Sequence, residues 1–353
     1  MYVWLFMLAA IVVLWFAIPE GLGEKKKKLI FLLVCGVMIV FLMGGRCPFR
    51  TCSRDGYFYY SLYLQSAQQS WDHLIENNGF EMGYIYLNRF LEFFFPSGQA
   101  IIYFEAIFTT GVVFWFIYRN TEDVFIAVVS YITVGSWSFF LSGFKQAFAI
   151  CFCLISVEWM KKKKFVSDLI ALLFIVAACS CHVTAWVFLA VYVLRNIKVN
   201  KNTVMLIIII IIVSLFSIDY VVGLFENFVD SEYTKGYEGN LLGGIVPITT
   251  FVIALFLSYI AWTQDKGYIE KNNLLVLMLL VGLGLYLFRY NTMVFERISY
   301  YFTAVLCVVL PNSLNAIKDV RTKTISKAFC IVLCSVLFIY RMTDAKDYYF
   351  YWQ

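Results

Sequence analysis

Charge is scarce in this sequence of 353 residues: only 14% are Asp, Glu, Lys or Arg, whereas 62% are hydrophobic. An ordinary soluble domain carries about 25% charged residues, so the composition excludes a soluble protein. Several apolar runs approach the ~20 residues that a membrane-spanning helix needs. The sequence therefore predicts an all-α polytopic membrane protein. The apolar N-terminus has no basic region, which favours a first span over a cleaved signal peptide.

The familiar nucleotide and hydrolase motifs are also missing. The sequence contains no Walker loop, no G-x-G-x-x-G after a strand, no G-x-S-x-G and no H-E-x-x-H. These absences argue against a nucleotide-fuelled transporter and against a soluble-type hydrolase. Cysteines gather near the two ends of 151–182, but without the C-x-x-C spacing of a zinc site. No metal site and no cofactor are predicted, and the sequence leaves the need for a divalent metal undecided.

The apolar runs predict about twelve transmembrane helices within one integral membrane domain, 1–353. Their ranges are 2–18, 29–45, 100–118, 124–141, 144–160, 165–181, 183–194, 203–218, 245–262, 274–290, 299–311 and 328–341. When the connecting loops are alternated, most Lys and Arg residues fall on one side, which the positive-inside rule makes cytoplasmic. Both termini then face outward. The net charge of +5 is small and indicates topology, not nucleic-acid binding.

Two long segments face outward in this topology, 46–99 and 219–244. The first contains two stretches, 61–78 and 81–95, that are amphipathic at helical spacing and rich in aromatic residues. Such helices tend to lie in the membrane interface. The second segment is acidic and rich in glycine, which predicts a mobile outer loop.

The basic residues on the outer side are mostly arginine, which grips phosphate or carboxylate better than lysine does. Three of them follow the second span, namely Arg46, Arg50 and Arg54. We expect them to form an anion site, with Asp55 as a candidate base beside it. The alternative is a solvated loop whose arginines touch lipid headgroups. Cys47 and Cys52 face an oxidising compartment here and either form a small disulfide loop or remain free.

Two further outer positions carry polar groups at span ends. Lys145 and Gln146 open a mid-chain span, and Lys145 lies on the side where the positive-inside bias disfavours it. It either takes part in the site or snorkels to the interface. His182 lies between two apolar runs, where an imidazole can serve as a general base. The alternative is a histidine that is hydrogen-bonded within a helix turn.

A short outer turn near residue 290 carries a third group of polar residues. Arg289, Glu296 and Arg297 bracket the turn, and Tyr300 follows on the next helix. An arginine at the edge of the hydrocarbon layer usually has an anionic partner. A simple surface pair between Glu296 and Arg297 would contribute little. The pattern predicts that this turn binds an anion.

Taken as an ordered set, these motifs resemble the EpsG-like branch of the Wzy-type bacterial polysaccharide polymerases. The matching residues are Arg54, Asp55, Tyr57 and Tyr60; Glu81, Gly83 and Tyr84; Lys145 and Gln146; Lys161–Lys164 before a span that ends at His182; and Arg297–Phe302. The resemblance covers most of the chain, although its motifs are short. One departure is that the family often has Arg-Gln where this chain has Lys145-Gln146, and lysine lacks the planar fork.

The resemblance implies a fold similar to the C-type membrane glycosyltransferases. It also implies transfer of a glycan from undecaprenyl pyrophosphate to a lipid-linked repeat unit, on the periplasmic side of the bacterial inner membrane. The expected partners are the lipid-linked donor and acceptor, membrane lipid and a chain-length regulator protein, but no nucleic acid. The expected catalytic residues are Asp55, His182 and Arg297, and Asp55 is slightly preferred over His182 as the base. The expected substrate-binding residues are Arg50, Arg54, Glu81, Lys145, Gln146, Arg289, Glu296 and Tyr300.

Other functions compete with this interpretation. A flippase for lipid-linked oligosaccharides would suit twelve spans, but it needs a polar path through the bilayer. Here most charges lie at span ends, and Glu105 is the main exception. An O-antigen ligase would share the donor but use a lipid A core acceptor, and a membrane acyltransferase is a third enzyme alternative.

Overall fold

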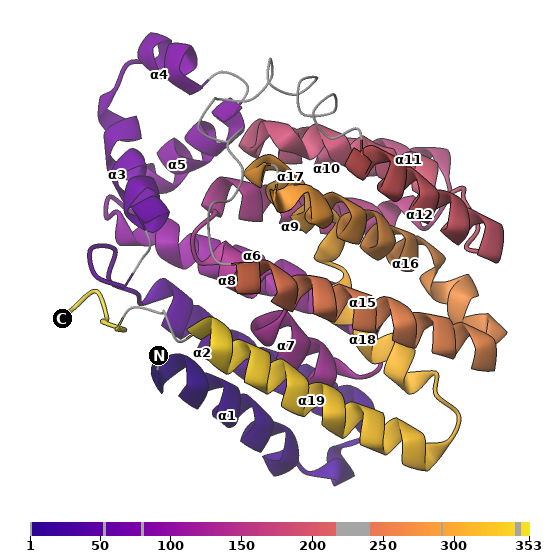
Figure 1. The fold of residues 1–353 in the computed structure, drawn as a ribbon. Helices are drawn as coiled ribbons and strands as arrows, with labels where there is room; N and C mark the ends of the chain where they lie inside the picture. The colour runs from indigo at the N-terminus through magenta and orange to yellow at the C-terminus, as the bar shows by residue number, and fades with distance from the viewer. Residues whose placement is uncertain (1, 52–53, 79–80, 217–240, 291, 343–346) are drawn as a thin grey trace. The chain divides into compact units, whose positions relative to one another are not determined.

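Helices account for nearly all of the ordered architecture in the computed structural model (Figure 1). The structure describes residues 2–51, 54–78, 81–216, 241–290, 292–342 and 347–353. Across these ranges the chain forms no β-strand, and its one isolated bridge pairs Arg46 with Phe350. The prediction of an all-α chain is confirmed. Most of the predicted outer loop 219–244 lies outside the described residues, and its last four residues begin a helix.

Five of the described helices are long and apolar enough to cross a membrane. They are α2 (Glu24–Gly44), α6 (Gln99–Asn120), α15 (Leu241–Gln264), α16 (Lys266–Leu287) and α19 (Val320–Met342). A sixth span is added if α17 (Met293–Thr303) and α18 (Leu306–Asn315), which meet at a bend of 49°, act as one. The structure thus supports five or six membrane-capable helices and does not confirm twelve.

The other predicted spans correspond to shorter or broken helices. They are α1 (Tyr2–Ala17), α7 (Val124–Thr133), α8 (Trp137–Phe140), α9 (Phe144–Met160), α10 (Phe165–Cys181), η3 (Val183–Leu189), α11 (Ala190–Leu194) and α12 (Lys201–Phe216). Predicted span 124–141 is interrupted between α7 and α8, and predicted span 183–194 begins as a 3₁₀ helix. A hydropathy average over a window cannot detect such breaks, because they depend on backbone hydrogen bonding and not on composition.

The chain divides into two compact units, of which the first comprises Met1–Trp186 and Ile331–Gln353. Here α2 packs on α6, α6 on α9, and α9 on α10. Helix α9 is buried almost throughout, and small residues along it, such as Ala147, Ala149 and Ser156, let its neighbours approach closely. Close approach increases van der Waals contact, which is a main source of helix association in a membrane.

The described residues of segment 46–99, which the sequence predicts to face outward, include α3 (Arg54–Gln68), α4 (Trp71–Asn78) and α5 (Met82–Phe94), all in the first unit. Predicted stretch 81–95 is therefore helical over most of its length, whereas predicted stretch 61–78 is divided between α3 and α4. Helix α5 contacts both α3 and α10. The C-terminal residues 349–351 pair with the loop that precedes α3, through Cys47 N to Tyr349 O at 2.9 Å and Tyr351 N to Gly45 O at 2.9 Å.

The second unit comprises Val187–Cys330. Helix α16 packs against α15 and α17, and α15 packs against α18. Three buried hydroxyl groups join α15, α16 and α18: Ser258 Oγ and Ser313 Oγ lie 2.9 Å apart, and Tyr268 OH lies 2.7 Å from Ser313 Oγ. Helix α12 differs from these helices because it contributes no buried residue.

Candidate active site

Three predicted site residues from distant parts of the chain meet in the first unit. Glu81 Oε2 lies 2.8 Å from Lys145 Nζ, and Glu81 Oε1 lies 2.6 Å from His182 Nδ1. The backbone N–H of Val183 also donates to Glu81 Oε1, at 3.4 Å. We call Glu81, Lys145 and His182 the carboxylate triad. The carboxylate is thus bound on both oxygens by basic side chains.

Helix ends position all three members of the carboxylate triad. Glu81 immediately precedes α5, Lys145 lies in the first turn of α9, and His182 directly follows α10 in an extended conformation. Gly83 lets α5 approach α10, because a Cβ atom there would lie 2.9 Å from the carbonyl oxygen of Ser180. The close contact between α5 and α10 therefore brings Glu81 within reach of His182.

The carboxylate triad is partly shielded from solvent. The side chains of Glu81, Lys145 and His182 are 20%, 14% and 18% exposed. Burial raises the pKa of the Glu81 carboxyl, but the hydrogen bond with His182 and the charge of Lys145 outweigh burial and lower it to about 2. Glu81 is therefore an anion at any working pH. Nδ1 of His182 is held by Glu81, whereas Nε2 has no hydrogen-bond partner among the described residues.

Aromatic rings lie next to the carboxylate triad. Tyr59 of α3 stacks on Phe144 at the start of α9, with ring centroids 4.9 Å apart. Tyr59 also meets Tyr84 of α5 edge to face at 5.7 Å, and Lys145 Nζ lies 5.8 Å from the centroid of the Tyr84 ring. Tyr84 and Phe144 are fully buried, so these rings pack on one another and support the carboxylate triad from inside the first unit.

Arg46 lies in the interior of the first unit and not at the surface as an anion-binding group. Its Nε donates to the carbonyl of Met43 at 2.7 Å, and one terminal nitrogen donates to the carbonyl of Leu141 at 2.8 Å. The other terminal nitrogen lies 3.7 Å from Glu105 Oε2, and both side chains are almost wholly buried. Sequence reasoning missed this pair. Its signal was the carboxylate inside an apolar span, which requires a buried partner.

The predicted site residues near the start of α3 make no contact with the carboxylate triad among the described side chains. Arg50 is exposed and lies over the ring of Tyr349, 5.0 Å from its centroid. Asp55 is exposed in the first turn of α3. The side chain of Arg54 lies outside the described residues, as does Cys52, which the sequence leaves either bonded to Cys47 or free. Gln146 is buried beside the triad lysine.

A second polar cluster belongs to the second unit. Arg289 lies 3.5 Å from Glu296 Oε2, and Tyr300 OH donates to Glu296 Oε1 at 2.8 Å. Arg289 also donates to the hydroxyl of Tyr286. Gly244 of α15 makes room mainly for the next residue, Tyr290, since a Cβ atom there would lie 3.0 Å from Tyr290 Cζ and 3.3 Å from Arg289 Cδ. We call Arg289, Glu296 and Tyr300 the arginine cluster.

The sequence predicts an anionic partner for an arginine at this turn, and for Arg289 that partner is Glu296. Arg297, the next residue on α17, is half-buried. Among the described residues, no group of three or more His, Cys, Asp or Glu side chains is placed to hold a metal ion.

Apolar helices with charged clusters at their ends define a helical membrane protein. Residues 29–353 match the EpsG family. The chain therefore belongs to the EpsG family, and the resemblance drawn from its motifs is confirmed. Membership indicates a polymerase-like role in polysaccharide synthesis at a membrane. No curated protein and no solved structure matches the chain.

Proposed function

We propose that this chain is a membrane glycosyltransferase that polymerises lipid-linked oligosaccharides. It would transfer the growing glycan from undecaprenyl pyrophosphate to a sugar hydroxyl of the next lipid-linked repeat unit, on the outer face of the bacterial inner membrane. The product would be O-antigen or a related surface polysaccharide. Membership of the EpsG family supports the class of reaction, and the carboxylate triad supports the chemistry.

The observation that carries the proposal is the 2.6 Å contact between Glu81 Oε1 and His182 Nδ1. A carboxylate on Nδ1 holds an imidazole in one tautomer and stabilises the cation that forms when the ring accepts a proton. Nε2 is then free to take the proton of the acceptor hydroxyl. The hydroxyl oxygen forms a bond to the anomeric carbon, and the bond from that carbon to the pyrophosphate oxygen breaks. Undecaprenyl pyrophosphate leaves with the bonding electrons.

His182 replaces Asp55 as our preferred base. Asp55 is exposed in the first turn of α3. His182 is instead partly shielded and oriented by a carboxylate, and an imidazole is well matched to proton transfer near neutral pH. The structure therefore favours a different candidate from the one that the sequence slightly preferred.

Lys145 would act as a positioning residue. Its ammonium group lies 2.8 Å from Glu81 Oε2 and neutralises that carboxylate. A lysine already engaged in this way holds Glu81 in place, and it offers less to a phosphate than the arginine of the family's usual Arg-Gln pair. Lysine is therefore adequate at this position in this chain, because the role we assign to it needs a point charge and not a fork.

We assign the binding of the donor's pyrophosphate to Arg297, beside the arginine cluster that holds this turn in place. Departure of the pyrophosphate builds negative charge, and preorganised donors aimed at such charge contribute several kcal/mol to transition-state stabilisation. Arg289 is buried and its charge is paired with Glu296, so it fixes the shape of the turn and leaves the contact with phosphate to Arg297. Arg297 lies just after the first turn of α17 and is half-buried.

The test is an in vitro polymerisation assay. Purified protein is incubated with lipid-linked repeat units and the product is run on a gel, for wild type, His182→Gln, Asp55→Asn and Arg297→Ala. His73→Gln is the matched control, because His73 is the chain's other histidine and is exposed on α4. We expect a ladder of added repeats from wild type, His73→Gln and Asp55→Asn, and none from His182→Gln or Arg297→Ala.

Two results would overturn the proposal. If wild type gives no ladder and unaltered substrate crosses liposomes, the chain is a transporter. If glycan appears only on a lipid A core acceptor, it is a ligase. Loss of the ladder in Asp55→Asn but not in His182→Gln would leave the polymerase intact and restore Asp55 as the base.

A further inference from the structure

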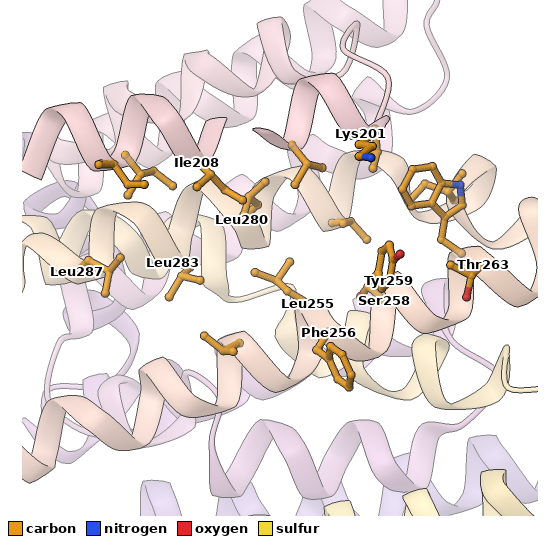
Figure 2. A pocket seen from close by; sticks show the side chains of 18 of the residues that line it. Lys201, Ile208, Leu255, Phe256, Ser258, Tyr259, Thr263, Leu280, Leu283 and Leu287 are labelled. Carbon is orange, nitrogen blue, oxygen red and sulfur yellow. The ribbon is translucent and has the colours of Figure 1, made fainter. Parts of the chain in front are cut away.

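The second unit contains a large apolar groove that the proposed polymerase reaction does not use. It lies between α12, α15 and α16 and has a volume of about 970 Å³ (Figure 2). Its walls are mainly branched aliphatic side chains, including Ile208 of α12, Leu255 of α15 and Leu280 of α16. This volume is at the upper end of the range for small-molecule sites, roughly 300–1,000 Å³.

The groove is long and follows the helix axes. Its lining runs along α12 from Lys201 to Leu215 and along α16 from Lys266 to Leu287. At 1.5 Å per residue these stretches measure roughly 20 and 30 Å, comparable with the ~30 Å hydrocarbon core of a bilayer. Helix α12 has no buried residue, so its side towards the groove is not covered by protein. A long-chain lipid has the shape to fill this space, whereas a compact polar metabolite does not.

One end of the groove is basic and the other is apolar. Lys201 and Lys266 both belong to the lining and both are exposed. Figure 2 shows Lys201, Tyr259 and Thr263 towards one end and Leu283 and Leu287 towards the other. The nearest carboxylate in the sequence, Asp265, is occupied in capping α16, where it accepts the N–H of Gly267 at 3.0 Å.

The basic end also has a predicted side of the membrane. Both lysines fall in the loops that the positive-inside rule makes cytoplasmic. The pyrophosphate of the proposed donor lies at the opposite surface, so the two lysines are not placed to bind it. A lysine near a membrane surface attracts anionic headgroups, and an aromatic side chain such as Tyr259 is typical of the interface region.

We propose that this groove binds one phospholipid with an anionic headgroup, drawn from the cytoplasmic leaflet. The phosphate would lie near Lys201 and Lys266, and the acyl chains would extend past Ile208 and Leu280. The bound lipid would fill the space between α12 and the α15–α16 pair and so hold α12 against the rest of the second unit. The proposal does not depend on the polymerase activity.

The test uses native mass spectrometry of the full chain released from bilayers of equal parts phosphatidylglycerol and phosphatidylethanolamine. We expect one retained phosphatidylglycerol per wild-type chain. The variant Lys201→Glu/Lys266→Glu should retain it at least about 25-fold more weakly, since each lysine contributes about fivefold. Lys271→Glu/Lys318→Glu is the matched control, because it makes the same change of charge at exposed lysines outside the groove.

A second variant tests the apolar part of the groove. Ile208→Trp adds bulk on α12, a helix with no buried residue to disturb, and should exclude the lipid while leaving the chain folded. Equal retention of the two phospholipids, or of phosphatidylglycerol by wild type and the charge-reversed variant, would overturn the proposal. Retention of a polyprenyl phosphate in place of the phospholipid would overturn it too, and the polymerisation assay would be unaffected by either result.

Discussion

The most informative single substitution is Glu81→Gln. It keeps the size of the side chain but removes the negative charge that lies 2.8 Å from Lys145 Nζ and 2.6 Å from His182 Nδ1. Lys145 then loses its counter-ion in a partly buried setting, and His182 loses the anion that stabilises its protonated ring. The substitution should therefore lower both stability and turnover.

The expected magnitudes follow from the geometry. A carboxyl whose pKa falls from 4.5 to about 2 on folding stabilises the folded state by about 3 kcal/mol when ionised. That contribution is fully present above pH 4.5 and is lost as the pH falls towards 2, because the pKa is lowered on folding. A loss of about 3 kcal/mol corresponds to roughly 5 °C in Tm for a chain of this size. Loss of an oriented general base should reduce kcat about 10²-fold or more.

Glu76→Gln is the control, because Glu76 is an exposed glutamate of α4 in the same outer segment. Tm would be measured in detergent at pH 7 and pH 3, and kcat by the rate of ladder formation. We expect a lower Tm for Glu81→Gln at pH 7, a smaller difference at pH 3, and no change for Glu76→Gln. Wild-type kcat in a folded Glu81→Gln chain would refute the role of the carboxylate in orienting His182.

Three further predictions concern the buried pair of Arg46 and Glu105, the carboxylate triad and the arginine cluster. Arg46→Met should lower the free energy of unfolding by about 3–5 kcal/mol, since it leaves Glu105 as an unpaired buried charge. The double variant Arg46→Met/Glu105→Leu should recover part of the lost Tm. A double variant as unstable as Arg46→Met would contradict the reasoning. Gly83→Ala should lower kcat by forcing α5 away from α10. Adding Ser180→Gly should partly restore kcat. Full activity of Gly83→Ala alone would show that this contact does not position the carboxylate triad. Tyr300→Phe removes one hydrogen bond to a glutamate, worth about 1 kcal/mol, and should raise KM for the donor severalfold in steady-state assays; an unchanged KM would separate the arginine cluster from donor binding.

Local sequence signals predicted much of the fold and several members of the carboxylate triad and of the arginine cluster. The helical class followed from composition, and each predicted span overlaps at least one helix in the structure, although 124–141 and 299–311 are each divided between two helices. Lys145, His182, Arg289 and Glu296 were singled out because charged groups at the ends of apolar runs are costly without a purpose. Glu81 entered through the family motif alone, because a glutamate in an outer amphipathic segment carries no signal of its own.

The sequence by itself determined that this chain is a helical membrane protein, because its excess of apolar residues can only be satisfied by lipid. It also determined the family, through short motifs in a characteristic order. Only the tertiary structure decided which charges meet. Glu81 and His182 are 101 positions apart, and their contact depends on how closely α5 packs against α10. Likewise Arg46 could be placed inside, beside Glu105, only once α2 and α6 were packed together, because pairing between charges is set by distance in space and not along the chain.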